Sequence, residues 1–236
     1  MTRLLSGVGT DLFRLFPLVL PVMACANLRY SEVFEPTESI HRIVVYSDAG
    51  QIELLPGAST IVERDIRAPE GALSLSHRVE DGTLVLQARC HSLVPCAVDT
   101  KVTVPREIPV EVRLGEGTLW ATGIAALVAE VDEGTADVDV LGQLDLQVGR
   151  GEVQASVAAD QSVRIAVGSG DITVHAQGTH YEMSTFGPRL QVEGLVDSAT
   201  SSGRLELVAP AGKIRVTGPR TVAEHQPLAR EAVPTP

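Results

Sequence analysis

Aromatic residues are scarce in this chain: Phe, Trp and Tyr make up only 3% of its 236 residues, although 44% of them are hydrophobic. Small aliphatic side chains must therefore fill the interior, which favours thin, regular β structure over a thick core of bulky rings. Helical periodicity is also missing, because no stretch of helical length repeats apolar residues with the period of an α-helix. The length allows one large domain or two small ones.

Positive charge is in short supply. The chain has 19 Lys and Arg against 30 Asp and Glu, a formal net charge of −11. Binding to phosphate backbones requires a basic face, so we expect no nucleic-acid partner. Sequence motifs of catalysis are missing too: there is no nucleophile elbow, phosphate-binding loop or HExxH zinc motif. We therefore expect no enzymatic activity and no cofactor.

Long hydrophobic runs are missing as well. The apolar stretch 15–24 is too short to span a bilayer as a helix, but it follows Arg3 and Arg14 as the core of a signal peptide does. Residues 22–25, Val-Met-Ala-Cys, resemble a bacterial lipobox. That resemblance implies cleavage after residue 24 and attachment of acyl chains to Cys25, which would anchor the protein to a membrane. An ordinary secretion signal and a buried cytosolic helix are the alternatives.

Cysteine is rare, with only three residues in the chain. Cys90 and Cys96 lie six positions apart, on either side of an expected turn at Pro95. We favour a disulfide between them, provided that the chain is exported to an oxidising compartment. A zinc site is the weaker alternative, because His91 lies beside Cys90 but no second ligand pair has a suitable spacing. Cys25 is then left over, as lipid attachment requires.

Short alternating strands make up most of the chain. Apolar and polar residues alternate in HRIVVYS, QIELL, LSLSHRVE, TLVLQARC and KVTVP, and Gly, Pro or Asp turns separate them. We predict a signal peptide over 1–24, a polar tether over 25–39, one β domain over 40–217 and a flexible proline-rich tail over 218–236.

A short repeat runs through this domain, with a unit of about seventeen positions. Glycines that close a strand recur at nearly even spacing, at Gly117, Gly134, Gly151, Gly170, Gly187 and Gly203, and Gly50 and Gly82 look like earlier members. Two short strands and two turns in each unit match one coil of a β-solenoid. We predict an all-β, single-domain β-solenoid of the β-helix or β-roll kind, right-handed as parallel crossovers usually are. An antiparallel meander is the alternative.

The repeat also predicts which side chains face inward. They are Leu119, Val138, Val140, Val153, Ala155, Ile172, Val174, Leu190, Val192, Leu205, Leu207, Ile214 and Val216. The neighbouring positions form an outward strip, whose candidate contact residues are Trp120, Asp137, Asp139, Glu152, Asp171 and His175. A solvated face is the simpler interpretation of this strip, and a ligand groove is the alternative.

Trp120 stands out because Leu119 and Ala121 claim the interior. We expect its indole to pack under the N-terminal half or a loop; otherwise it is an exposed contact residue. Metal binding is the weaker interpretation of the polar residues nearby. Asp137, Asp139 and Asp145 form one candidate calcium set, and His175 with His180 another pair of ligands, but separate exposed side chains explain both. We predict no metal site.

With these units, the chain resembles the bacterial "putative adhesin" family, DUF4097. The resemblance covers residues 40–217 and rests on repeated [GDE]-x-G-x-[VIL]-x-[VLA] units, and on the order of VVYSDAGQIEL, a cysteine pair and KVTVPREIPVEVRLGEG. It implies a β-solenoid fold and an envelope-associated, non-enzymatic domain. It brings no catalytic residues to carry over.

The functional expectation is a lipid-anchored protein of the bacterial cell envelope, on the periplasmic face or cell surface, that acts as a binding or scaffold module. Its expected partners are the membrane, through the lipid, and an envelope protein or polysaccharide. One alternative is a carbohydrate-active enzyme, a lyase or hydrolase, in which Asp137 pairs with Asp139 or Glu152 at the ~5 to 10 Å that glycosidases use. Another is an envelope-stress sensor or structural protein without a ligand.

Overall fold

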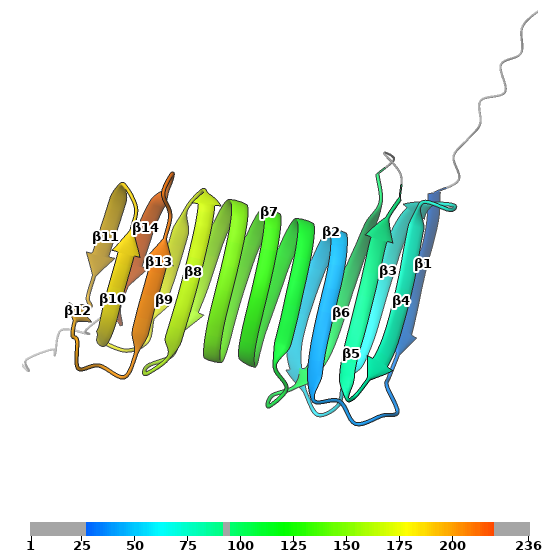
Figure 1. Cartoon of the computed structure of the whole chain (residues 1–236), viewed down its shortest axis with the longest axis horizontal. Coiled ribbons are helices and arrows are strands. Elements are labelled where there is room, and N and C mark those ends of the chain that lie inside the picture. The colour runs from blue at the N-terminus through cyan, green and yellow to red at the C-terminus, as the bar shows by residue number, and fades with distance from the viewer. Residues whose placement is uncertain (1–26, 92–94, 220–236) are drawn as a thin grey trace, which may run out of the picture.

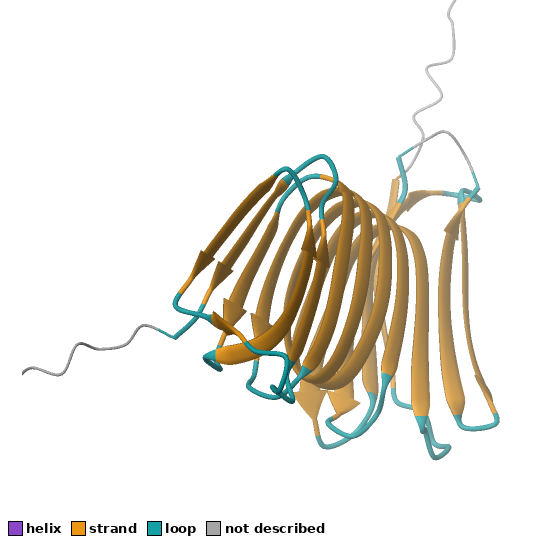
Figure 2. Ribbon diagram, turned by 60° about the vertical axis from the view of Figure 1, so that its left-hand side comes forward, coloured by secondary structure: helices purple, strands orange, loops and turns teal. Residues whose placement is uncertain are grey.

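The computed structural model describes residues 27–91 and 95–219, so the predicted signal peptide, Cys25 and most of the predicted tail lie outside it. All regular secondary structure in the described residues is β, and 14 strands belong to one sheet. The prediction of an all-β protein is confirmed (Figures 1 and 2). The described part of the chain offers no helix with the length and apolar character needed to cross a membrane.

The strands are β1 (Asn27–Phe34), β2 (Arg42–Gly57), β3 (Ile61–Pro69), β4 (Leu73–Glu80), β5 (Thr83–Cys90), β6 (Ala97–Pro105), β7 (Val110–Val157), β8 (Ser162–Ser169), β9 (Ile172–Ala176), β10 (His180–Phe186), β11 (Arg189–Glu193), β12 (Val196–Asp197), β13 (Arg204–Val208) and β14 (Lys213–Thr217).

Strand β7 winds around the long axis of the molecule. It has 48 residues, which as a straight strand would extend on the order of 150 Å, and Figure 2 shows it curling through successive circuits instead. We call one such circuit a winding. Each winding contributes one segment to a first ladder of parallel strands and, after a glycine corner, a second segment to a second ladder. Because the windings pair in parallel, this part of the chain is not an antiparallel meander.

The first ladder runs in the order β5, β2, β7, β8, β13, β10, and the second in the order β6, β2, β7, β9, β14, β11. Aliphatic side chains line up between the ladders. In the second ladder, for example, Val153 pairs with Ile172, which pairs with Ile214, and all three are buried. Each such side chain contributes about 1.5–3 kcal/mol on burial. The predicted inward residues are buried in the structure, except Leu190 and Val192.

The windings approach most closely at their glycine corners. A Cβ added to Gly134 would lie 1.8 Å from the carbonyl oxygen of Gly117, and one added to Gly151 would lie 1.6 Å from that of Gly134. Gly151 also has φ +144°, where side chains are disfavoured. Gly117, Gly134 and Gly151 thus stack in a series that we call the glycine column. It also includes Gly50 at one end and Gly170 and Gly212 at the other.

The last windings do not stack in the order of the sequence. β13 and β14 pair with β8 and β9 on one side and with β10 and β11 on the other. The chain therefore passes from β9 to the outermost position, forms β10 and β11 there, and returns to fill the gap with β13 and β14 (Figure 1). Gly212 consequently follows Gly170 in the column, and the prediction that Gly187 and Gly203 continue it is wrong.

The N-terminal end shows the same inversion. β5 and β6 lie outside β2, although β2 precedes them in the chain and stacks directly on β7. Strands β1, β3 and β4 complete this end by antiparallel pairing of β1 with β3, β3 with β6 and β4 with β5. The segment expected to be a polar tether, 25–39, thus contains a strand. Gly82 lies in the turn between β4 and β5 and is not part of the glycine column.

Replacing a corner glycine should destabilise the protein far more than replacing a turn glycine. Gly151→Ala combines a positive φ with a backbone clash, and we expect a loss of about 3 kcal/mol or more. The matched control is Gly71→Ala, because Gly71 also has a positive φ (+74°) but an added Cβ there meets nothing within 4 Å. We expect this control to cost about 1 kcal/mol. Urea unfolding of the two variants measures both values, and equal losses would contradict the close stacking of the corners.

Candidate functional site

A hollow of about 360 Å³ lies on the outer face of the second ladder. Three windings of β7 and strand β9 supply its walls. The residues that line it are Trp120, Thr135, Ala136, Asp137, Glu152, Val153, Gln154, Asp171 and Thr173. Four of the six residues predicted as a contact surface, Trp120, Asp137, Glu152 and Asp171, are therefore brought together at one place.

Trp120 forms one wall of this hollow. Its side chain is 43% exposed, and its backbone pairs with that of Glu53 in β2. The expectation that the indole packs beneath the N-terminal half or a loop is wrong, because alternation along β7 buries Leu119 and Ala121 and turns Trp120 outward. A tryptophan exposed to this extent leaves a flat apolar surface in contact with water.

Three carboxylates face the same hollow. Asp137 lies one winding after Trp120, and Glu152 and Asp171 precede the paired residues Val153 and Ile172. All three side chains are exposed. Asp171 has a second task, since its Oδ1 accepts a hydrogen bond of 2.8 Å from the backbone N–H of Lys213 and so fixes the start of β14.

The other two predicted contact residues lie outside this set. Asp139 is half-buried two residues beyond Asp137 and does not line the hollow. The His175 Nδ1 atom lies 2.8 Å from the Thr217 hydroxyl, on the neighbouring winding. Asp145 belongs to the other ladder, where it pairs with Arg164, so the calcium set of Asp137, Asp139 and Asp145 does not assemble.

Two threonines and a glutamine complete the polar lining. Thr135, Gln154 and Thr173 reach the hollow because each occupies an outward position next to a predicted residue. Gln154 lies one repeat after Asp137, and Thr135 lies one repeat before Glu152. The repeat itself was therefore the signal for these neighbours, although none of the three was among the six contact residues predicted from the sequence.

Basic residues begin directly beside the acidic ones. Because β14 stacks on β9, Arg215 pairs with Thr173 and Lys213 adjoins Asp171. Arg189 then lies beside Lys213, as β11 pairs with β14. The outer face of the second ladder thus changes from acidic to basic within one winding.

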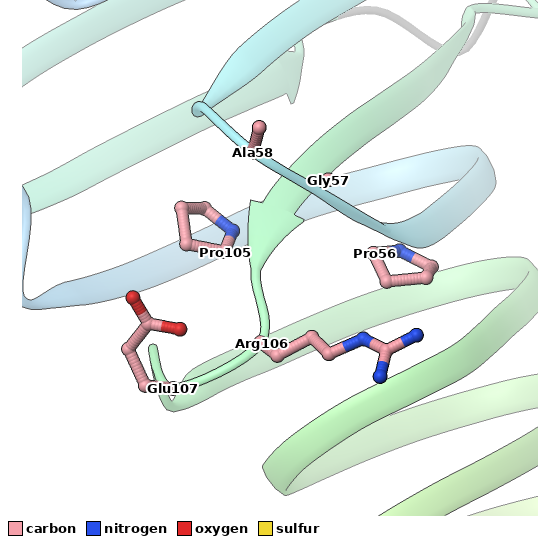
Figure 3. Close-up of a pocket in the computed structure, with 6 residues that line it drawn as sticks. All are labelled: Pro56, Gly57, Ala58, Pro105, Arg106 and Glu107. Carbon is pink, nitrogen blue, oxygen red and sulfur yellow. The ribbon is translucent and has the colours of Figure 1, made fainter.

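The described residues form other hollows, whose linings differ from that of the hollow beside Trp120. One of about 460 Å³ is lined by Pro56, Gly57, Ala58, Pro105, Arg106 and Glu107. Figure 3 shows the charged side chains of Arg106 and Glu107 pointing away from each other there. Another, of about 250 Å³, lies on the first ladder beside Tyr46. Its Arg113 already stacks over the Tyr46 ring and pairs with Glu111 and Glu130.

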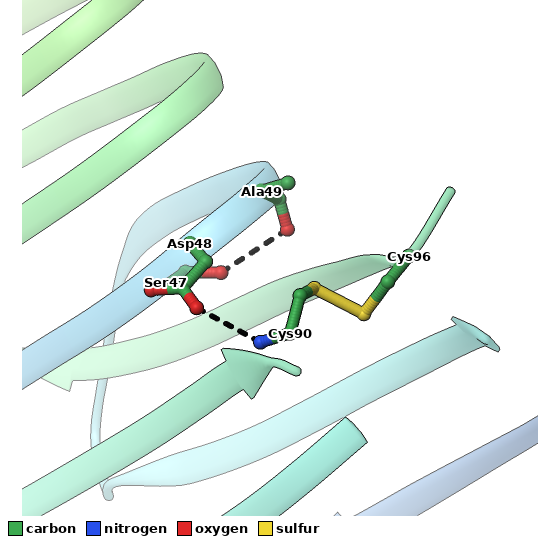
Figure 4. Close-up of a disulfide and its surroundings, with 5 residues drawn as sticks. All are labelled: Ser47, Asp48, Ala49, Cys90 and Cys96. Atoms are coloured by element: carbon green, nitrogen blue, oxygen red, sulfur yellow. Dashed lines mark hydrogen bonds between the residues drawn. A yellow bond between two sulfur atoms is a disulfide. The ribbon is translucent and has the colours of Figure 1, made fainter. Parts of the chain in front are cut away.

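Cys90 and Cys96 are joined by a disulfide, with Cα atoms 5.9 Å apart. It connects the end of β5 to the beginning of β6 (Figure 4). The carboxylate of Asp48, on β2, accepts a hydrogen bond of 2.8 Å from the Cys90 backbone N–H, and the Ser47 hydroxyl donates to the Ala49 carbonyl. The Asp48 contact attaches the disulfide to the neighbouring winding.

Comparison with known proteins identifies the fold. No family model and no curated protein matches the chain. Among solved structures, a "putative cell adhesion protein" from Clostridium sporogenes is 15% identical, with a TM-score of 0.50 over 82% of this chain and 100% of that chain. "Putative adhesins" from Parabacteroides distasonis (11% identical, 83% and 98% covered) and Bacteroides fragilis (13%, 83% and 99%) reach TM-scores of 0.35 and 0.29.

The likeness to the Clostridium protein shows that the two chains share an all-β fold along nearly the whole described length. At this level of identity the comparison concerns the fold alone. What the chain does must be argued from its own surface.

Proposed function

We propose that this protein is a non-enzymatic binding module of the bacterial cell envelope, and that the hollow beside Trp120 binds a polysaccharide. We further propose that the domain is a right-handed β-solenoid, with a repeat of about seventeen positions, and belongs with the adhesin-like domains that its sequence resembles. The description of the Clostridium protein as a "putative cell adhesion protein" agrees with a role in surface binding.

The observation that carries the proposal is the combination of one exposed indole with a row of carboxylates and hydroxyls. The apolar C–H face of a sugar ring packs on a flat aromatic surface, while its hydroxyl groups donate hydrogen bonds to carboxylate oxygens. A volume of about 360 Å³ lies in the range of small-molecule sites. A polymer fits this site better than a free sugar, because the face continues along the windings and offers further polar contacts.

Binding explains the site better than hydrolysis does. Asp137 and Glu152 both line the hollow, as a glycosidase would require of two carboxylates. However, both side chains are exposed, and Trp120 is the only aromatic residue that lines the hollow. A hydrolase also distorts its sugar toward the transition state, which requires more extensive contact than this open hollow provides.

Anchoring at Cys25 is part of the same proposal. A disulfide between Cys90 and Cys96 persists in oxidising compartments, which supports export of the chain. Cys25 itself lies outside the described residues, and the argument for its acylation is the lipobox-like sequence Val22-Met23-Ala24-Cys25. Several acyl chains provide stable membrane attachment where a single chain does not.

Titration with oligosaccharides tests the site directly. Trp120 is the only tryptophan, so its fluorescence reports binding without a label. We expect chitohexaose, an oligomer of six N-acetylglucosamine units, to change the emission with a saturable curve, and Trp120→Ala to abolish binding measured by calorimetry. Trp120→Phe should retain part of the affinity, and Tyr46→Ala, on the other ladder, should retain all of it. Binding that survives Trp120→Ala would exclude this site, and release of shorter sugars would show an enzyme instead.

Mass spectrometry tests the anchor. In a bacterium that processes lipoproteins, we expect the membrane fraction to contain a chain that begins at position 25 and carries the added mass of acyl chains on Cys25. Cys25→Ala should move the protein to the soluble fraction. An unmodified Cys25 in mature, exported protein would contradict lipid attachment and would leave the polysaccharide site untouched.

A further inference from the structure

The C-terminal end of the stacked windings is open. Strand β11 pairs with β14 on one side and has no partner on its other side within residues 27–91 and 95–219. Strand β10 is covered at His180 and Tyr181 by the two residues of β12, and its Met183 N–H donates to the Asp197 carboxylate at 3.1 Å, so the free edge is that of β11. Backbone N–H and C=O groups along such an edge are free to pair with another strand.

Apolar side chains are uncovered at the same end. Leu190 pairs with Ile214 and continues a column of fully buried residues, yet it is 51% exposed because no further winding covers it. Phe186 and Val196, 65% and 52% exposed, lie on the outer face of the same end, because Phe186 pairs with half-buried Val208 and Val196 with exposed His180. Met183 and Val192 are only partly buried. The hydrophobic interior of the fold therefore reaches the surface here.

The opposite end differs in carrying a buried charge. There Arg64 of β3 points between the layers and is only 2% exposed, and its guanidinium contacts the Glu32 carboxylate at 2.8 Å and the Ser76 carbonyl at 3.3 Å. An inward-pointing charge near a sheet edge is one of the features that discourage edge-to-edge pairing. No charged side chain occupies an inward position in β10 or β11.

The sequence of β11 is self-complementary in charge. It reads Arg189-Leu190-Gln191-Val192-Glu193, with a basic residue at one end and an acidic residue at the other. In an antiparallel pair of two copies centred on Gln191, each Arg189 faces the other copy's Glu193 and each Leu190 faces the other copy's Val192. A parallel pair would instead place equal charges side by side.

Arg189 also needs an acidic neighbour. Its partner within the sheet is Lys213, so two positive charges lie side by side on β11 and β14. The free side of β11 is where a carboxylate would relieve this repulsion. Glu193 of a second copy provides that carboxylate, and a two-fold axis supplies it to both copies at once.

We propose that two copies of this chain associate through their C-terminal ends, with the two β11 strands pairing antiparallel about Gln191. The pairing completes the hydrogen bonds of both edges and buries Leu190 and Val192 of each copy. It leaves the hollow at Trp120 exposed in both copies, so the dimer presents two such faces and two N-terminal ends.

The test is the mass of the full chain in solution, measured by sedimentation over a range of concentrations in a Cys25→Ser background. We expect a concentration-dependent dimer. Arg189→Glu and Glu193→Arg each place like charges opposite one another at two positions of the dimer, and each should weaken association at least about tenfold. The double variant Arg189→Glu/Glu193→Arg restores opposite charges across the pair and should recover dimerisation. Recovery in a chain changed at both positions would show that charge pairing is what matters.

Two controls keep the result interpretable. Arg29→Glu changes an exposed charge on β1, at the other end, and should leave the dimer unchanged. The urea midpoint of each variant, measured on dilute monomer, shows whether the variant is folded. A chain that stays monomeric at every concentration overturns the proposal. This holds whether the C-terminal end is then covered by the chain's own residues after 219 or by another protein. A dimer that ignores both β11 substitutions, or that is lost in Arg29→Glu, overturns it as well.

Discussion

The stacking of windings depends on contact between backbones at the glycine corner. From Gly50 to Gly212, the carbonyl oxygen of one corner occupies the place where a side chain of the next would begin. This approach brings both ladders into hydrogen-bonding register, and the register then places Val153, Ile172 and Ile214 in one buried column. Because aromatic side chains are rare, the interior is thin, and small aliphatic residues can fill it only if the corners are this tight.

The all-β fold, the inward columns and the outward strip could be predicted from the sequence, because strand alternation and the regular spacing of glycines are local properties. The order of the terminal windings could not. Gly187 and Gly203 have suitable spacing, but the chain passes over one position and returns to it, so Gly212 takes the place after Gly170. Strand β1 was missed for a related reason: its partner β3 is distant in the sequence, as the pair Glu32 and Arg64 shows.

The candidate site was predictable to the same extent. Trp120, Asp137, Glu152 and Asp171 converge because the register keeps outward positions of successive windings side by side. Asp139 and His175 have the same phase but lie farther along their strands, beyond the hollow. The surface changes from acidic to basic within one winding, since β14 brings Lys213 and Arg215 directly against β9. The order of the strands, which depends on long-range pairing, thus decides which charged residues become neighbours on this face.

The measurement that tests this account most directly is hydrogen exchange along the last three windings, detected by mass spectrometry. The Arg189→Glu chain is used, so that association of two copies adds no protection. Amides in a winding covered on both sides open only with the neighbouring windings, whereas those at an edge open locally. The account predicts that residues 204–217 exchange more slowly than residues 180–193. Faster exchange in 204–217 than in 180–193 would mean that the windings stack in sequence order, and would contradict the arrangement of the glycine column.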